Sequence, residues 1–89
     1  MRKAVEDFAH AMEAKLSLND HKGGWDKESV DWLFSRLQEE VEELRIEMSK
    51  SNRFSSLILQ ECIDVANFAM MIYDRTPSQP EWGGVEYDS

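Results

Sequence analysis

The chain has 89 residues, of which 42% are hydrophobic and 31% are charged, and its formal net charge at pH 7 is −8. This is the composition of one globular domain and not of a disordered acidic segment. Because the lysines and arginines are scattered along the chain, we expect no nucleic-acid polymer and no anionic membrane as a partner. A single copy of this size buries only about 60 to 65% of its unfolded surface, so we expect an oligomer.

The single cysteine, Cys62, excludes an internal disulfide bond, which fits a reducing compartment. We expect it to pack in the core, because no basic residue that would activate the thiol is close to it in sequence. The N-terminus has no apolar core of the signal-peptide type, and no stretch of about 20 residues is free of charge. These features predict a cytoplasmic protein.

The first predicted helix runs from Arg2 to about Leu18, because its apolar residues recur at spacings of three and four. A break follows over residues 18–29, where an Asn-Asp pair and two adjacent glycines interrupt the helical period. Asp26 is the predicted N-cap of the next helix. The break is either a simple turn or a ligand-binding loop, because glycine amides can approach a phosphate closely.

The second predicted helix extends from about Lys27 to Lys50. Its apolar residues form a continuous stripe that we expect to be the core face: Val30, Leu33, Phe34, Leu37, Val41, Leu44 and Met48. The run QEEVEEL adds four glutamates within five positions, which repel one another at helical spacing. A solvated outer face explains Glu39 and Glu42 better than it explains Glu40, because Glu40 borders the apolar stripe.

The third predicted helix, Phe54 to Asp74, is apolar on nearly every side, as expected of a helix inside a bundle. Glu61 nevertheless falls within the apolar stripe of this helix, and Asp64 lies at its edge. An ionised carboxylate buried alone is costly, so it requires a cation, a network of hydrogen-bond donors or a raised pKa. We therefore expect a partner for these carboxylates elsewhere in the chain.

The helical period ends after residue 75. We divide the chain into a helical domain, residues 1–75, and an acidic tail, residues 76–89, which contains two prolines and two glycines. Trp82 and Tyr87 give the tail two aromatic side chains. The tail could dock on a neighbouring subunit, cover a site or stay loose.

The two long helices together suggest a metal site. A short connection makes them antiparallel neighbours, and Glu40 and Asp64 each lie 12 residues from Asn52, so the pairs Glu40/Glu43 and Glu61/Asp64 stand at similar heights. Residues three apart share one helix face, so two such pairs can supply four carboxylates to one pocket. Four carboxylates without a His or Cys ligand predict a site for Mg²⁺, for which Mn²⁺ can substitute.

A metal-free alternative is that Glu61 is buried by a salt bridge to Arg36, Arg45 or Arg53. A di-iron carboxylate bundle requires Glu-x-x-His, and no histidine follows any of these glutamates. Mg²⁺ bound by carboxylates in a cleft usually holds a substrate phosphate and orients a water molecule for in-line attack. Metal ions would thus allow an acidic protein to bind a polyphosphate.

The order ExxE then ExxD, together with KLSLNDHKGGW, LQEEVEEL and ECIDVANFAMMIYD, resembles the all-α nucleoside triphosphate pyrophosphohydrolases of the MazG-like superfamily. Over roughly residues 8–74 the chain is similar to the small phage and bacterial branch associated with dATP/dGTP pyrophosphohydrolases. The resemblance implies an all-α, antiparallel helical bundle that is completed by forming a homodimer or a homotetramer. If a phage encodes the protein, the resemblance implies that it works in the host cytoplasm.

The resemblance also implies roles for individual residues. It assigns metal coordination to Glu40, Glu43, Glu61 and Asp64. The substrate-binding residues that it implies are Lys15, Asn19, Lys22, Trp25 and Asn67. For two of these residues a structural role remains open, because Asn67 could be a hydrogen-bonded asparagine of the bundle and Trp25 could be plain core.

The implied activity is Mg²⁺-dependent hydrolysis of a deoxynucleoside triphosphate, with dATP or dGTP as the expected substrate, to the monophosphate and pyrophosphate. Glu39 or Glu40 would be the catalytic base that takes the proton of the attacking water. A pyrimidine nucleotide is the alternative substrate. The rival hypothesis is a non-catalytic acidic helical oligomer, or a nucleotide-binding module, whose carboxylates serve a partner's basic surface.

Overall fold

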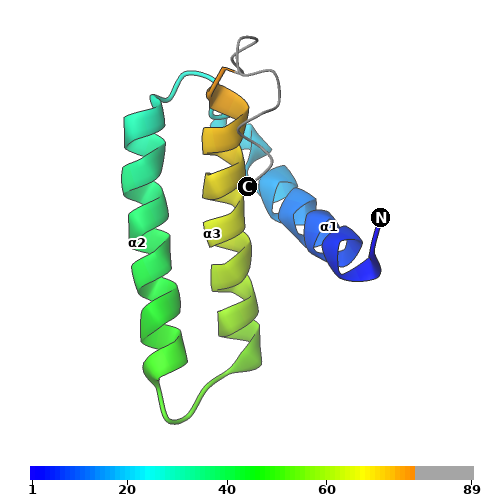
Figure 1. The fold of residues 1–89 in the computed structure, drawn as a ribbon, viewed down its shortest axis with the longest axis vertical. Helices are drawn as coiled ribbons and strands as arrows, with labels where there is room; N and C mark the ends of the chain where they lie inside the picture. Colours follow the sequence, from blue (N-terminus) through cyan, green and yellow to red (C-terminus); the bar gives the residue numbers. More distant parts are fainter. Residues whose placement is uncertain (78–89) are drawn as a thin grey trace, which may run out of the picture.

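The computed structural model describes residues 1–77, which fold into three α-helices and one short 3₁₀ helix (Figure 1). The α-helices are α1 (Lys3–Leu18), α2 (Val30–Ser49) and α3 (Ser55–Arg75), and the 3₁₀ helix η1 (Asp20–Lys22) follows α1. No strand occurs within the described residues, so the all-α prediction is confirmed. The predictions for Trp82 and Tyr87 fall outside the described residues.

The helix α2 begins three residues later than predicted, at Val30 instead of Lys27. The hydroxyl oxygen of Ser29 accepts a hydrogen bond from the backbone N–H of Trp32 at 3.0 Å. This bond satisfies one of the backbone N–H groups that the first helical turn leaves without a partner. Asp26 lies in the turn before the helix, so the prediction that it is the N-cap is wrong.

Helices α2 and α3 lie side by side and run antiparallel, as their short connection requires, and α1 leaves the pair at an angle (Figure 1). The helix α3 contacts both α2 and α1. Its middle, residues 61–68, is therefore covered from two sides, and every residue of this stretch is buried or half-buried. Contacts on two sides account for the apolar residues in the middle of α3.

The hydrophobic interior of a single copy is small. Leu33 is the only buried hydrophobic side chain among residues 1–77. The apolar stripe of α2 is only partly internal, since Phe34, Val41 and Met48 are 51%, 47% and 41% exposed. The prediction that this whole stripe is the core face is therefore wrong for the described chain, because α2 is rotated so that Glu40 faces inward.

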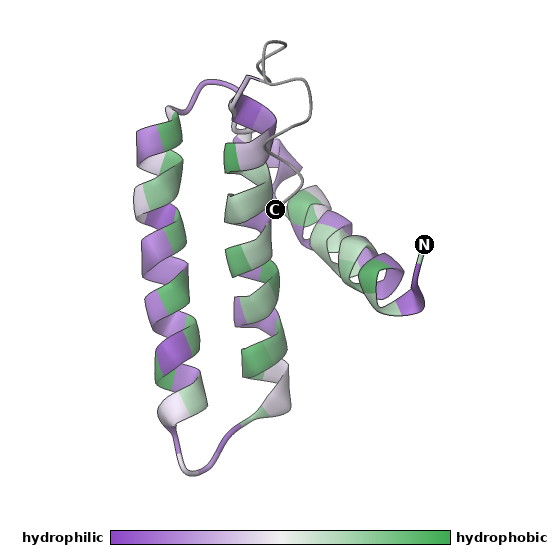
Figure 2. Cartoon of the chain, in the orientation of Figure 1, coloured by the Kyte–Doolittle hydropathy of each residue, from purple (hydrophilic) through white to green (hydrophobic). Residues whose placement is uncertain are grey.

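Hydrophobic residues are spread along all three helices and are densest on α3 (Figure 2). Val5 and Phe8 on α1 and Leu59 on α3 are also exposed. Apolar surface of this kind favours association with another chain, and the predicted homodimer or homotetramer would cover it. α3 also has the length and the mean hydropathy, 1.2, of a membrane span, a test that the core helix of a soluble protein passes equally well. A cytoplasmic location remains our prediction.

Candidate metal centre and adjoining pocket

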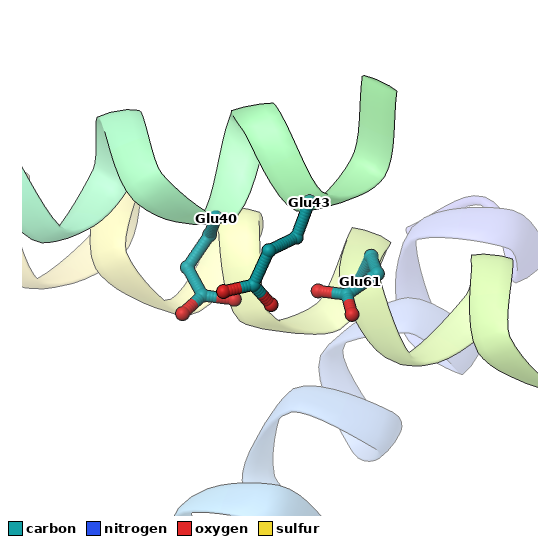
Figure 3. Close-up of side chains that lie close together, drawn as sticks. All are labelled: Glu40, Glu43 and Glu61. Carbon is teal, nitrogen blue, oxygen red and sulfur yellow. The ribbon is translucent and has the colours of Figure 1, made fainter. Parts of the chain in front are cut away.

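Three glutamates from two helices converge at the centre of the α2/α3 pair. Glu40 and Glu43 project from α2 and Glu61 projects from α3, and one carboxylate oxygen of each lies within 4.8 Å of those of the other two (Figure 3). The three-residue spacing places Glu40 and Glu43 one turn apart on the face of α2 that meets α3. These three residues, which we call the acidic triad, could hold a metal ion.

The acidic triad contains buried oxygen atoms without a hydrogen-bond partner. Glu40 is only 6% exposed, and both its Oε1 atom and the Oε1 atom of Glu61 are buried with no partner among the described residues. A buried polar atom without a partner is costly, and a divalent cation with oxygen ligands would remove that cost. The donor set is made of carboxylate oxygens alone, which suits Mg²⁺ or Mn²⁺ better than a soft metal.

Burial and repulsion by neighbouring carboxylates raise the pKa values of two members of the triad, Glu40 and Glu61. Burial, together with the charges of Glu43, Glu40 and Asp64, raises the pKa of Glu61 to about 7. Burial, with the charges of Glu43 and Asp64, also raises the pKa of Glu40, although the nearby Arg36 opposes this shift. A bound cation would offset the repulsion and favour the ionised form of both carboxylates, as metals do at carboxylate ligands.

Asp64, the fourth predicted metal ligand, lies beside the triad and not within it. Its Oδ1 atom accepts a hydrogen bond from the Nζ atom of Lys15 on α1 at 2.9 Å. Its charge still contributes to raising the pKa of Glu40 and of Glu61, so it is close enough to act on the triad. The sequence places four carboxylates in one pocket, whereas the structure brings three together and pairs the fourth with a lysine from another helix.

None of the three arginines proposed as alternative partners of Glu61 pairs with it, and two of them pair with other glutamates. Arg36 pairs with Glu39 and with the Oε2 atom of Glu40, the latter at 3.1 Å. Arg45 pairs with Glu42 on the outer face of α2. Within residues 1–77 no lysine or arginine forms an ion pair with Glu61. The metal-free explanation for its burial, a salt bridge to an arginine, is therefore wrong.

A pocket of about 340 Å³ is lined by Arg36, the ion-pair partner of Glu40, and by Asp64, whereas the triad residues themselves are not part of its lining. It lies between the C-terminal end of α1, the loop that follows, the first turns of α2 and the second half of α3. The lining includes all of the predicted substrate-binding residues: Lys15, Asn19, Lys22, Trp25 and Asn67. Asp64 also lines the pocket and thereby connects it to the acidic triad.

The loop after α1 is anchored to the end of α3. The indole Nε1 atom of Trp25 donates a hydrogen bond to Asp74 at 3.0 Å, and Arg75 donates one to the backbone oxygen of Glu28 at 3.2 Å. Gly23 has φ of +90°, a conformation in which side-chain-bearing residues are strained, although a Cβ atom there would touch nothing. From the sequence, this loop could be either a simple turn or a ligand-binding loop. In the structure it forms one wall of the pocket.

Asn67 is held in place but keeps one polar atom without a partner. Its Nδ2 atom donates a hydrogen bond to the backbone oxygen of Met12 at 3.3 Å, which ties α3 to α1. The residue is 4% exposed, and its Oδ1 atom is buried without a partner among the described residues. The structural role considered for Asn67 is therefore present, and its Oδ1 atom can still accept a hydrogen bond from a ligand.

The structure gives two further residues, Glu39 and Arg36, positions that differ from those expected from the sequence. The side chain of Glu39 is 60% exposed and pairs with Arg36, so it lies outside the acidic triad. Arg36 was considered only as a partner of Glu61, yet it lines the pocket, pairs with Glu40 and stacks 5.0 Å from the ring centroid of Phe68. The sequence could have indicated the pair with Glu40, because residues four apart on a helix are neighbours. It could not have indicated the contact with Phe68, which belongs to another helix.

Comparisons with protein-family models, with curated proteins and with solved structures gave no match.

Proposed function

We propose that the protein is a divalent-cation-dependent hydrolase that cleaves a nucleoside triphosphate between its α and β phosphates, as the MazG-like pyrophosphohydrolases that it resembles do. One observation carries this proposal, namely three converging carboxylates, two of which have a buried oxygen without a partner, beside a pocket lined by aromatic and basic side chains. The pocket volume of about 340 Å³ falls in the range of small-ligand sites. The fold that we propose is correspondingly a MazG-like bundle completed by a second or further copies of the chain.

In this proposal the acidic triad binds the metal ion and the pocket binds the nucleotide. Glu40, Glu43 and Glu61 would hold Mg²⁺ or Mn²⁺, with Asp64 joining them once it leaves Lys15. The bound ion would offset charge on the phosphoryl oxygens and activate a water molecule. Because aromatic and basic residues line the same pocket, a nucleobase and a charged phosphate chain can be bound side by side.

Within the pocket, Lys22 would attract the phosphates and Trp25 would stack on the base or wall it in. Asn67 presents an acceptor oxygen, so it would accept a hydrogen bond from a sugar hydroxyl. A purine deoxynucleotide, dATP or dGTP, is the substrate that we propose, and a pyrimidine deoxynucleotide is the alternative. Asn19 and Lys15 complete the predicted binding set at the end of α1.

Glu40 is our preferred base for the proton of the attacking water. Its carboxylate is buried in the triad, whereas that of Glu39 is 60% exposed and engaged with Arg36. The raised pKa of Glu40 also suits a general base, which works best when its pKa is close to the working pH. Glu39→Gln should therefore retain most of the activity and Glu40→Gln should not.

The decisive assay is pyrophosphate release from a panel of nucleoside and deoxynucleoside triphosphates in the presence of Mg²⁺. Glu61→Gln should lower kcat/KM by at least about 100-fold, because even outer-shell partners of a bound metal are worth about 10- to 100-fold. Glu42→Gln is the matched control, since Glu42 lies on the outer face of α2 and pairs with Arg45. No turnover of any nucleotide, or a Glu61→Gln variant that behaves like the parent, would refute the proposal.

A non-catalytic helical oligomer or nucleotide-binding module is the second candidate, favoured by the exposed apolar residues of α1 and α2. Thermal melts separate the two. A hydrolase that holds metal and nucleotide should gain thermal stability from the two together, because ligands that bind only the folded state stabilise it. An acidic assembly module should melt at the same temperature with and without Mg²⁺ or Mn²⁺.

A further inference from the structure

The pocket and the acidic triad meet at two ion pairs. Along α2, Arg36 lines the pocket and Glu40, four residues later, belongs to the triad. Along the antiparallel α3, Asp64 lines the pocket and Glu61, three residues earlier, belongs to the triad. Arg36 and Asp64 are thus the residues at which each helix passes from pocket to triad, and each is half of an ion pair.

In both pairs the carboxylate is less exposed than the cation. The side chains of Glu40 and Asp64 are 8% and 25% exposed, whereas those of their partners Arg36 and Lys15 are 32% and 34% exposed. Both cations line the pocket. Arg36 thus links Glu40 of the triad to the pocket, and Lys15 pairs with Asp64, which lies beside the triad and lines the pocket as well.

We propose that Arg36 and Lys15 are exchangeable counter-cations, which neutralise Glu40 and Asp64 until a divalent cation takes these carboxylates and which then bind the phosphates of the ligand. This inference rests on the proposed function for the identity of the ligand. It adds Arg36 as a substrate-positioning residue, and it makes metal binding a condition for phosphate binding by both groups.

Competition for the same oxygen atoms is the physical reason for the exchange. A carboxylate oxygen that accepts a charge-assisted hydrogen bond from Arg36 or Lys15 is less available to a metal ion. A divalent cation brings two positive charges to a cluster that the two side chains only partly neutralise. Once displaced, Lys15 loses its ion-pair partner and Arg36 keeps only the exposed Glu39, so both side chains would be attracted to a phosphate in the pocket.

Arg36 is better suited than a lysine to the second half of the exchange. Its guanidinium lies 5.0 Å from the ring centroid of Phe68, and this cation–π contact would keep it at the pocket after it leaves Glu40. A guanidinium also offers a fork of N–H donors that fits two oxygens of one phosphate. Phe68 itself lines the pocket, so the stacked guanidinium faces the ligand space.

The exchange predicts effects of opposite sign for two ligands. In calorimetric titrations without nucleotide, Arg36→Met and Lys15→Met should each bind Mn²⁺ more tightly than the parent, by about tenfold, because the competing ionic contact is gone. At saturating Mn²⁺, both variants should bind inorganic tripolyphosphate more weakly, by about tenfold or more. A side chain that merely supports the fold would not tighten one ligand and weaken the other.

The chain supplies matched controls for both substitutions. Arg45→Met removes an arginine of α2 that also pairs with a glutamate, but outside the pocket, and Lys3→Met does the same for a lysine of α1 paired with Asp7. Neither control should change the affinity for Mn²⁺ or for tripolyphosphate. Arg36→Lys, which keeps the charge and the fold, should keep the affinity of the parent for Mn²⁺ and lose part of the affinity for tripolyphosphate.

Unchanged or weaker Mn²⁺ binding by both Arg36→Met and Lys15→Met, with the fold verified by circular dichroism, would overturn the exchange. So would tripolyphosphate binding of equal strength with and without Mn²⁺. If the parent hydrolyses nucleotides while the variants show no opposite shifts, only this inference fails. If the parent binds no Mn²⁺ at all, the proposed function fails with it.

Discussion

The substitution Glu61→Gln should stabilise the protein in the absence of divalent cations, although it removes a residue that we place at the centre of the site. Glu61 lies next to Glu40 and Glu43, with Asp64 close by, and it has no cationic partner within the described residues. Burial and these charges raise its pKa from the ordinary 4.5 to about 7. A neutral amide of the same shape removes the repulsion and keeps the packing.

The size of the expected stabilisation follows from the raised pKa of Glu61. Because the pKa of this acid is raised in the folded state, Glu61 contributes stability that is fully present below pH 4.5 and is lost as the pH rises through about 7. At about 1.4 kcal/mol for each pH unit, the interval from 4.5 to about 7 corresponds to about 3 kcal/mol. Solvent at this half-buried side chain reduces the expected gain to about 1 to 2 kcal/mol above pH 7.

The assay is urea unfolding followed by far-ultraviolet circular dichroism, at one protein concentration, with a chelator and at several pH values. The unfolding free energy of the parent should fall between pH 4.5 and about 7. That of Glu61→Gln should fall less and should exceed that of the parent at pH 8. With saturating Mn²⁺ the order should reverse, because the parent gains binding energy that the variant lacks.

Glu42→Gln is the control for this experiment. Glu42 is a glutamate on the solvent side of α2, and its hydrogen-bonded ion pair with Arg45 holds its pKa below the usual value. Its substitution should bring no stabilisation at any pH and no change in the response to Mn²⁺. The reasoning would be refuted if Glu61→Gln were no more stable than the parent at pH 8 in chelator and responded to Mn²⁺ as the parent does.

Three further substitutions test the fold and the pocket. Leu33→Ala should lower the unfolding free energy in urea titrations by about 2 to 5 kcal/mol, because Leu33 is fully buried; a loss below about 1 kcal/mol would show that the small core is not where stability lies. Ser29→Ala should cost about 1 kcal/mol in the same titrations through loss of the cap on Trp32, and Ser29→Asp should restore it. Trp25→Phe removes the hydrogen bond to Asp74 but keeps a ring at the pocket, so calorimetry with a nucleotide should show near-parent affinity, whereas Trp25→Ala should weaken binding by about tenfold; equal affinities would contradict a role for the ring.

The helices themselves were predictable from sequence because their signals are local. Hydrophobic spacing and the glycine-containing break identify α1, α2 and α3 to within a few residues. The cap at Ser29 was missed in favour of Asp26 because both residue types cap helices equally well, and only the path of the loop decides which one reaches a free N–H. That path is fixed at the far end of the loop by the contacts of Trp25 and Arg75.

The proximity of the triad was also within reach of sequence, since Glu40, Glu43 and Glu61 follow from helical spacing and an antiparallel pairing of known register. The rotation of α2 about its own axis could not be predicted from the sequence. Hydrophobic periodicity favoured a core face through Val41, yet Val41 is 47% exposed and Glu40 is buried. The buried residues of α2 are Leu33 and Glu40, so the inward face of this helix is partly acidic.

The amino-acid sequence by itself determines an all-helical chain with carboxylates at matching heights on two neighbouring helices, because both properties depend on the regular geometry of the helix. Only the tertiary structure decides which charges pair. Asp64 binds Lys15, 49 residues away, because α1 leaves the α2/α3 pair at an angle that brings its C-terminal end to the pocket, and Arg36 of α2 stacks on Phe68 of α3. Contacts of this kind depend on helix crossing and rotation, which no residue spacing within one helix encodes.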